Sequence, residues 1–338
     1  MKIKHHILLV FIFSSRILVS QDIEIVTQLS SAPGRLLLNG TDLYVSEVDK
    51  LSKIDLSISS PRSIDVANGL KSPSGMVLNG NDLYIALYDD NKISKLDITA
   101  TSPVLTDVVT GLRGPNGMAL VGNDLYFSES GANRISKIDI SSSMPNPTIV
   151  ATGLDFPGPI VTAGSALYVA EIIGDKISKI DLSSNSATPT TVIALTRPNG
   201  LRVKDGNLYV AQVRNGKISK VDISGSSAAL SDAITGLQEP TDLVFFEESI
   251  YVAERQPQRV SKVTSLILGT VPSDIAVYPN PCRDFIHIAH ERMEYTIYDS
   301  FGKVQLTGSR SRIVDVRSLA SGTYILEAGD QKSIIVKQ

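Results

Sequence analysis

Most of this chain offers only carboxylate, amide, hydroxyl and lysine side chains for chemistry. Residues 21–271 contain no histidine, cysteine or tryptophan. The histidines and the single cysteine lie outside that range, as His5, His6, Cys282, His287 and His290. This composition excludes a Ser-His-Asp triad, a cysteine nucleophile and a histidine metal site from residues 21–271. One cysteine also excludes an internal disulfide framework.

Two sets of polar residues recur at regular spacing and could hold a ligand. The first set directly follows a proline and consists of Ser74, Asn116, Asn199 and Thr241. The second set follows a short tyrosine-containing segment and consists of Glu47, Glu129, Glu171 and Glu254, with Leu87 and Gln212 at the other two equivalent positions. If such oxygen ligands converge, the cation that they suit is Ca²⁺ or Mg²⁺.

Plain structural roles compete with ligand binding at both sets. Three of the glutamates precede a basic residue by five positions, as Glu129–Arg134, Glu171–Lys176 and Glu254–Arg259. Pairs of this kind are expected to close a loop as exposed ion pairs, each worth about 0–1 kcal/mol. Asn116 and Asn199 can likewise form turns, because Asn side chains bond nearby backbone groups.

The elements that must position these residues form a sequence repeat. Its clearest marker is a tyrosine that recurs every 40 to 42 residues, at Tyr44, Tyr84, Tyr126, Tyr168, Tyr209 and Tyr251. Each copy begins at a proline, namely Pro33, Pro73, Pro115, Pro157, Pro198 and Pro240. Six copies of this length indicate one supersecondary unit that is stacked six times.

Each copy predicts four antiparallel strands. Turn dipeptides such as Asn39-Gly40 and Asn79-Gly80 separate short runs rich in Val, Ile, Leu and Tyr, which is a hairpin signal. Four-stranded units of this size pack radially as the blades of a propeller. Leu125-Tyr126-Phe127 is apolar on both faces, as expected of a sheet covered by two neighbours. The predicted fold class is all-β: a six-bladed, four-stranded β-propeller over residues 21–264 plus a small C-terminal β-sandwich.

The ring is expected to close through the start of the mature chain. The sixth copy ends with its third strand at residues 259–263, so residues 23–29 should supply its fourth strand. In this meander, the turn into strand one and the loop between strands two and three lie on the same side. The candidate binding residues at the channel mouth are therefore Ser74, Asn116, Glu129, Glu171, Asn199, Thr241 and Glu254.

One blade carries a family resemblance. Pro115-Asn116-Gly117-Met118, Leu125-Tyr126-Phe127-Ser128-Glu129 and Arg134-Ile135-Ser136-Lys137-Ile138-Asp139 resemble the NHL-repeat propeller and its gluconolactonase-like relatives. These propellers include lactonases, lyases and binding platforms. The lactonase resemblance implies that Asn116 and Asn199 are metal ligands, for Ca²⁺ or Mg²⁺. Ser74 and Thr241 stand where further acidic ligands are expected, and two neutral amides alone make a poor divalent site.

The first twenty residues have the pattern of a secretory signal peptide. Lys2 and Lys4 precede an apolar run at 7–13, and a small residue, Ser20, stands before Gln21. Cleavage is expected between Ser20 and Gln21. The apolar run is too short to span a membrane, and no later segment is apolar for 18 residues, so we expect no transmembrane segment.

The tail has a different pattern. Residues 265–273 lack the repeat and are expected to be a linker to a module at 274–338. Tyr278-Pro279-Asn280-Pro281, Tyr298-Asp299 with Gly302-Lys303, and Gly322-Thr323-Tyr324-Ile325-Leu326 resemble the C-terminal sorting domain of type IX secretion substrates. The resemblance implies export through the periplasm and the outer membrane by the type IX machinery, often with tail cleavage and attachment to the cell surface. Cys282, His287 and His290 are expected to be surface or packing residues.

Two functions remain open on these residues. The first is an exported, non-catalytic propeller that binds an extracellular protein, peptide or glycan over its channel face. The second is a divalent-metal-dependent lactonase- or lyase-like hydrolase that uses Asn116 and Asn199 at the channel mouth. A weaker third option is a sensor module without a small ligand, since tryptophan is absent. The formal net charge of −3 without a basic block argues against a nucleic-acid partner. We favour the binding surface.

Overall fold

The computed structural model describes residues 21–184, 187–225, 228–265, 277–288, 294–299, 304–309, 313–328 and 331–338. The expected signal peptide, most of the expected linker, and His5, His6 and His290 lie outside the described residues. The chain divides into a large unit, residues 23–263, and a small unit that includes residues 264–338. Each unit is described by itself.

The described strands of the large unit form six four-stranded sheets, which we number as blades in chain order. The first blade contains β2 (Leu36–Asn39), β3 (Asp42–Ser46), β4 (Lys50–Asp55) and β5 (Ser63–Asn68). The second contains β6 (Pro73–Asn79), β7 (Asp82–Leu87), β8 (Lys92–Asp97) and β9 (Thr106–Val109). The third contains β10 (Pro115–Val121), β11 (Asp124–Glu129), β12 (Arg134–Asp139) and β13 (Thr148–Thr152).

The remaining three blades repeat the same order of strands. The fourth contains β14 (Pro157–Ala163), β15 (Ala166–Glu171), β16 (Lys176–Asp181) and β17 (Thr190–Ala194). The fifth contains β18 (Pro198–Lys204), β19 (Asn207–Gln212), β20 (Lys217–Asp222) and β21 (Ala229–Ile234). The sixth contains β22 (Pro240–Phe246), β23 (Ser249–Glu254), β24 (Arg259–Ser265) and β1 (Gln21–Gln28). Single-turn 3₁₀ helices η1 (Ser130–Ala132) and η2 (Val213–Asn215) lie in two of the loops.

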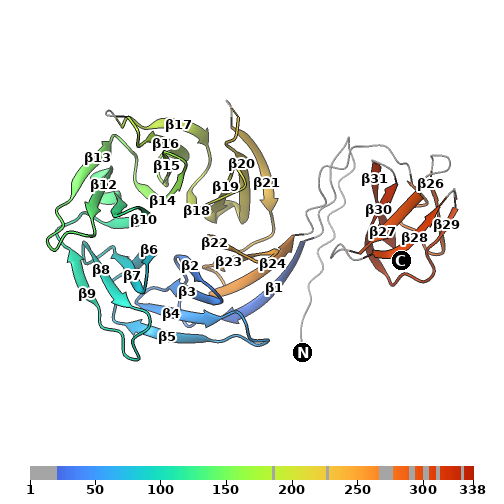
Figure 1. Ribbon diagram of the computed structural model, residues 1–338, viewed down its shortest axis with the longest axis horizontal. Helices are drawn as coiled ribbons and strands as arrows, with labels where there is room; N and C mark the ends of the chain where they lie inside the picture. Colours follow the sequence, from blue (N-terminus) through green and yellow to red (C-terminus); the bar gives the residue numbers. More distant parts are fainter. Residues whose placement is uncertain are drawn as a thin grey trace. The chain divides into compact units, whose positions relative to one another are not determined.

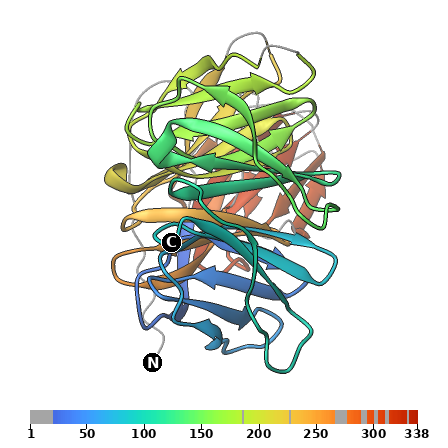
Figure 2. The same ribbon diagram turned by 90° about the vertical axis from the view of Figure 1, so that its left-hand side faces the viewer.

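The blades are arranged around a central axis. The first strand of each blade lies nearest the centre and the fourth lies at the rim (Figure 1). Seen from the side, the strands run across the thickness of the ring (Figure 2). This arrangement confirms the predicted fold class. The Pro steps and the loops between second and third strands share one side of the ring, which we call the channel face, because Pro115 pairs with Glu129 in the third blade and Pro73 with Leu87 in the second.

The core consists of layers between neighbouring blades. Tyr84 of β7 packs with Leu125 and Phe127 of β11 in one buried cluster. Leu125 and Phe127 are fully buried because they face the second blade, whereas Tyr126 between them packs against the fourth blade on the other face of the sheet. Each such side chain contributes about 1.5–3 kcal/mol through removal of apolar surface from water. Tight turns at Gly40 (φ +58°) and Gly80 (φ +59°) reverse the chain between the first two strands.

The sixth blade is completed by the start of the described chain. β1 is bonded to β24, and Leu29 N–H donates to the Gln258 carbonyl at 2.8 Å. Ile23 packs against the cluster between the fifth and sixth blades, and Val26 packs against the cluster between the sixth and first blades. One strand therefore covers an edge of the ring and contributes to two core layers.

The small unit is a pair of antiparallel sheets in its described residues. One sheet contains β25 (Val277–Tyr278), β26 (Phe285–Ile288) and β29 (Ile313–Asp315). The other contains β28 (Val304–Ser309), β27 (Glu294–Tyr298), β30 (Gly322–Ala328) and β31 (Gln331–Lys337). Cys282 is buried in its core, where desolvation raises the pKa of its thiol. His287 stacks on Tyr278, with ring centroids 5.3 Å apart. Cys282 and His287 therefore both have packing contacts.

Deletion of residues 21–30 should cause aggregation or a large drop in the thermal unfolding midpoint. The deletion exposes the edge of β24 and removes the core contacts of Ile23 and Val26. Differential scanning calorimetry of the deletion variant and wild type checks this. Ile25→Ser is the matched control, because Ile25 in the same strand is 50% exposed. A melting curve unchanged by the deletion would contradict this account of closure.

Candidate functional site

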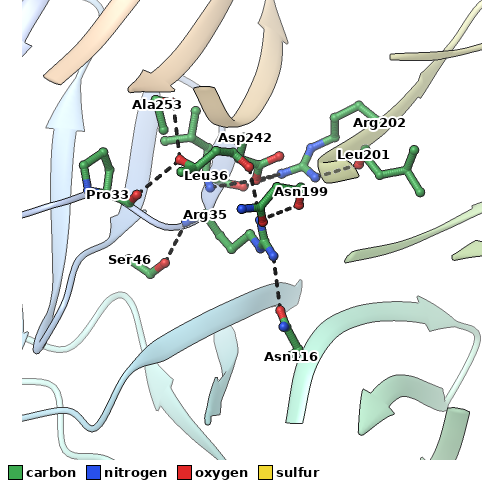
Figure 3. A network of polar contacts seen from close by, with 11 residues as sticks. Pro33, Arg35, Leu36, Ser46, Asn116, Asn199, Leu201, Arg202, Asp242 and Ala253 are labelled. Atoms are coloured by element: carbon green, nitrogen blue, oxygen red, sulfur yellow. Dashed lines mark hydrogen bonds and ion pairs between the residues drawn. The ribbon is translucent and has the colours of Figure 1, made fainter. Parts of the chain in front are cut away.

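The centre of the channel face is occupied by an arginine that the sequence motifs did not single out. Arg35 stands two residues after Pro33, where the second, third and fifth blades have Gly75, Gly117 and Gly200. Its side chain extends to the centre of the ring, between the start of β10 and the start of β18 (Figure 3). Only 8% of Arg35 is exposed.

The Arg35 guanidinium joins four blades through neutral oxygen acceptors. Its Nη1 donates to the Asn199 side-chain oxygen at 2.8 Å and to the Asn199 carbonyl at 2.6 Å. The same nitrogen donates to the Thr241 carbonyl at 3.1 Å, and Nη2 donates to Asn116 Oδ1 at 3.1 Å. Asn116 and Asn199 therefore lie around a side chain of the protein itself (Figure 3).

A buried carboxylate continues this network on one side. Asp242 has no exposed surface, and its Oδ2 accepts from Leu36 N–H at 3.0 Å and from Arg202 Nη2 at 2.6 Å. Arg202 Nη2 also donates to the Leu36 carbonyl at 2.6 Å. These contacts tie the first, fifth and sixth blades together, including backbone groups of β2 at the inner edge of its sheet.

The centre of the channel carries a positive charge. Burial lowers the pKa of Arg35 to about 10, with Asp242 raising it and the nearby Arg202 and Arg255 lowering it. Arg35 therefore remains charged at neutral pH. In the described residues its hydrogen-bond acceptors are amide and carbonyl oxygens, which solvate the cation without forming an ion pair with it.

The amides of Asn116 and Asn199 do not fit a divalent metal site. Both Oδ1 atoms accept from Arg35, so a metal ion bound by both would have to displace a guanidinium of like charge. The described residues also contain no group of three or more His, Cys, Asp or Glu side chains placed to hold a metal. Asn116 and Asn199 thus act as hydrogen-bond acceptors for an internal cation.

The hydroxyls predicted at the channel mouth link neighbouring blades. Ser74 donates to the carbonyls of Pro115 and Asn116, both at 3.2 Å, across the boundary between the second and third blades. Thr241 donates to the Pro33 carbonyl at 3.1 Å and is 1% exposed. These side chains therefore bond carbonyl groups at the start of the adjacent blade.

The expectation of exposed ion pairs at the glutamates is wrong. Glu129 and Glu254 have no exposed surface and Glu171 is 1% exposed. Arg134 and Arg259 do bond the expected partners, each with a 2.7 Å contact from Nε. However, the carboxylates lie beneath the loops and face the interior of their blades, so their surfaces offer nothing to a ligand.

Each buried glutamate joins three parts of its own blade. Glu129 accepts from the Arg134 side chain, from the Ser136 hydroxyl at 2.6 Å and from Arg113 N–H at 2.9 Å. Glu171 and Glu254 repeat the hydroxyl and backbone contacts, with Ser178 and Asp155 and with Ser261 and Gln238. A serine on the third strand and a backbone N–H just before the proline that begins the same blade are therefore the constant partners.

The two blades without this glutamate use other means. Gln212 accepts from the Ser219 hydroxyl at 2.6 Å and donates to the Thr196 carbonyl at 3.2 Å. In the second blade Leu87 is fully buried, and Ser94 donates instead to Asp107 at 2.8 Å. The recurring serine is satisfied in all these cases, which indicates a structural role for the whole position.

Arg35→Met should lower the free energy of unfolding by about 2–4 kcal/mol. Methionine preserves the length of the side chain but leaves the oxygens of Asn116, Asn199 and Thr241 without their donor. Urea unfolding at neutral pH checks the loss. Arg214→Met on η2 is the control, because Arg214 is exposed. A change below about 0.5 kcal/mol, the range of ordinary surface substitutions, would contradict the bridging role.

Glu129→Gln should reduce stability at neutral pH by about 2 kcal/mol and flatten its dependence on acid pH. Burial alone raises the pKa of Glu129, but the bonds from Arg134, Ser136 and Arg113 outweigh it and hold that pKa below 4.5. The stabilisation is therefore present above pH 4.5 and is lost as pH falls through the lowered value. Urea unfolding from pH 7 to pH 3 measures both effects, with the exposed Glu248→Gln as control. Parallel pH profiles for Glu129→Gln and wild type would refute this.

Comparison with known proteins identifies the tail and the fold. Residues 276–338 match the family described as the secretion system C-terminal sorting domain. A search of curated proteins finds no match. No described helix is long and apolar enough to cross a bilayer.

Solved propellers resemble the chain in structure at low sequence identity. An inactive variant of virginiamycin B lyase from Staphylococcus aureus, with quinupristin, is 13% identical, with 93% of this chain and 98% of the lyase covered and a TM-score of 0.53. A nidogen/laminin complex is 18% identical, with 66% and 89% covered and a TM-score of 0.57. An auxiliary nutrient binding protein from Bacteroides thetaiotaomicron is 15% identical, with 70% of each chain covered and a TM-score of 0.59. At these identities the likeness concerns the fold alone. The chain is a β-propeller followed by a type IX secretion sorting domain, and it is secreted or attached to the cell surface.

Proposed function

We propose that the exported propeller binds an extracellular protein, peptide or glycan on its channel face and is not an enzyme. The observation that supports this most directly is the buried Arg35 guanidinium. It uses the oxygens of Asn116 and Asn199, which are the residues that a lactonase-type site would need for its metal. The loops around this closed centre then become the surface available to a ligand.

The composition of the propeller supports binding over lyase chemistry. Residues 21–271 contain no histidine and no cysteine. In virginiamycin B lyase, a variant with one histidine replaced by alanine is described as catalytically inactive. The nutrient binding protein is an example of the same fold in a binding role. These relatives illustrate the two options, and the side chains of this propeller agree with the second.

We further propose the finer organisation of the chain. Residues 1–20 act as a signal peptide that is cleaved between Ser20 and Gln21, and the repeats are of the NHL type. The propeller then extends over residues 21–264, a linker over 265–273 and the sorting domain over 274–338. The type IX secretion machinery recognises the last of these.

Calorimetric titration of the whole mature chain with Ca²⁺ or Mg²⁺ should give no saturable heat. The physical reason is the like charge of Arg35 at the position where the amide oxygens converge. A lactone-hydrolysis assay should show no turnover with either cation. Asn199→Ala is the decisive variant: a turnover in wild type that this substitution abolishes would defeat the binding proposal.

Binding itself is tested by charge reversal on opposite faces of the ring. The whole mature chain is applied to arrays of bacterial glycans and peptides. Arg197→Glu alters the channel face just before Pro198, and Lys204→Glu alters the opposite face at the end of β18. Loss of a captured ligand with Arg197→Glu but not with Lys204→Glu supports the proposal. The reverse pattern, or no ligand on either array, argues against it.

A further inference from the structure

The channel face contains a hollow between the second and third blades. Its volume is about 350 Å³. It is lined by the half-buried Tyr88, by the exposed Asp89, Asn91 and Arg113, and by two glycines, Gly114 and Gly131. The hollow lies at the loop after β7, the turn before β10 and the loop after β11.

Tyr88 departs from the other repeats at its position. The equivalent residues are Val48, Ser130, Ile172, Val213 and Arg255, so no other blade has an aromatic ring there. The repeats act as an internal comparison, since all six blades have the same strand order. A ring that is present in one blade only is not required by the fold.

Gly114 makes room for this ring. Its φ is +58°, but Ser72, Phe156, Arg197 and Glu239 adopt values of 46° to 52° at the equivalent positions. The backbone therefore does not require glycine. A Cβ atom on Gly114 would lie 2.9 Å from Tyr88 Cε2. A side chain here would displace the ring, so Gly114 allows Tyr88 to pack against the backbone in its present position. The pairing of Tyr88 with Gly114 is a local feature of one boundary.

The polar rim of the hollow is anchored through its backbone. Arg113 N–H is held by Glu129 at 2.9 Å, and Gly131 N–H donates to the Arg113 carbonyl at 3.1 Å. Asn91 Oδ1 accepts from Gly114 N–H at 2.8 Å, and the Ser72 hydroxyl donates to Asp89. A rim that is fixed before binding loses little entropy when a ligand arrives.

Arg113 provides the positive charge of the hollow, whose lining also includes the carboxylate of Asp89. Its guanidinium forms no hydrogen bond or ion pair within the described part of the chain, and its side chain is exposed. A planar guanidinium in this setting matches a carboxylate bidentately. Asp89 and Asn91 beside it can accept from and donate to hydroxyl groups. Burial and Asp89 raise the pKa of Tyr88, so its hydroxyl keeps its proton at neutral pH.

We propose that this hollow binds a sugar that carries a carboxylate, that is, a hexuronic acid unit of a glycan. The inference rests on the proposed binding function and specifies its ligand. The Tyr88 ring packs against the C–H face of the sugar, Arg113 pairs with the carboxylate, and Asp89 and Asn91 bond hydroxyl groups. The volume suits one ring-sized unit, whereas an extended peptide requires a longer groove.

The test compares D-glucuronate with D-glucose on the whole mature chain. Saturation-transfer NMR titrations give the affinity of each sugar for wild type, Arg113→Gln and Tyr88→Ala. Wild type should bind glucuronate at least about tenfold more tightly than glucose. Arg113→Gln should remove that preference, and Tyr88→Ala should weaken glucuronate by about tenfold or more. Arg214→Gln, on the loop of the fifth blade, is the matched control and should leave both affinities unchanged.

Three results would overturn the inference. They are no saturable signal from glucuronate, equal affinity for the two sugars in wild type, and affinities unchanged by Arg113→Gln. Arg113→Gln keeps the test decisive if Tyr88→Ala fails to fold, because only the backbone of Arg113 joins the Glu129 network. A ligand that depends on Arg197 but not on Arg113 would leave the binding function intact and remove this site. If a peptide carboxylate displaces glucuronate from the hollow and binds more tightly, the ligand is a peptide and the sugar assignment is wrong.

Discussion

A single buried cation determines the organisation of the channel. Arg35 reaches from the first blade to oxygens on the third, fifth and sixth, so four separate sheets share one donor group. The inner strands of a propeller have no neighbour on their channel edge, and their backbone groups must be satisfied by water or by side chains. Here Arg35, Arg202 and Asp242 perform that role on one side of the ring. The polar residues around these three side chains therefore form hydrogen bonds within the protein and stabilise the fold.

The repeats show how one structural need is met by different residues. The third-strand serine and the backbone before each proline require a polar partner, which is a carboxylate in the third blade and an amide, Gln212, in the fifth. Where Leu87 removes the partner, Asp107 on the rim strand replaces it. Positions that vary while preserving the same bonds report on stability. Tyr88 and Gly114, in contrast, occur at one blade boundary only and preserve no bond that the other blades share. This is the pattern expected of residues that serve the hollow beside them.

Much of the fold follows from local signals in the sequence. The tyrosine period, the Asn-Gly turns and the two-sided apolar strands predict the blades because each depends on residues close in the chain. The role of Arg35 could not be predicted in this way. Its acceptors, Asn199 and Thr241, are far from it in the sequence, and the repeat pattern gives no sign of a side chain that crosses the channel. The five-residue spacing correctly predicted Arg134 as the partner of Glu129. It could not predict that the carboxylate is buried, because burial depends on how the loop folds over it.

The pairing of β1 with β24 also has a kinetic consequence. The two strands come from opposite ends of the propeller sequence, so they are separated by more residues than any other pair of neighbouring strands in the ring. Because a chain is synthesised from its N-terminus, β1 is made first and its partner last. The closing strand must therefore wait, unpaired, while the intervening sheets assemble. Folding of the ring is therefore expected to be slow. It is also expected to fail if β1 pairs with another chain before β24 is available.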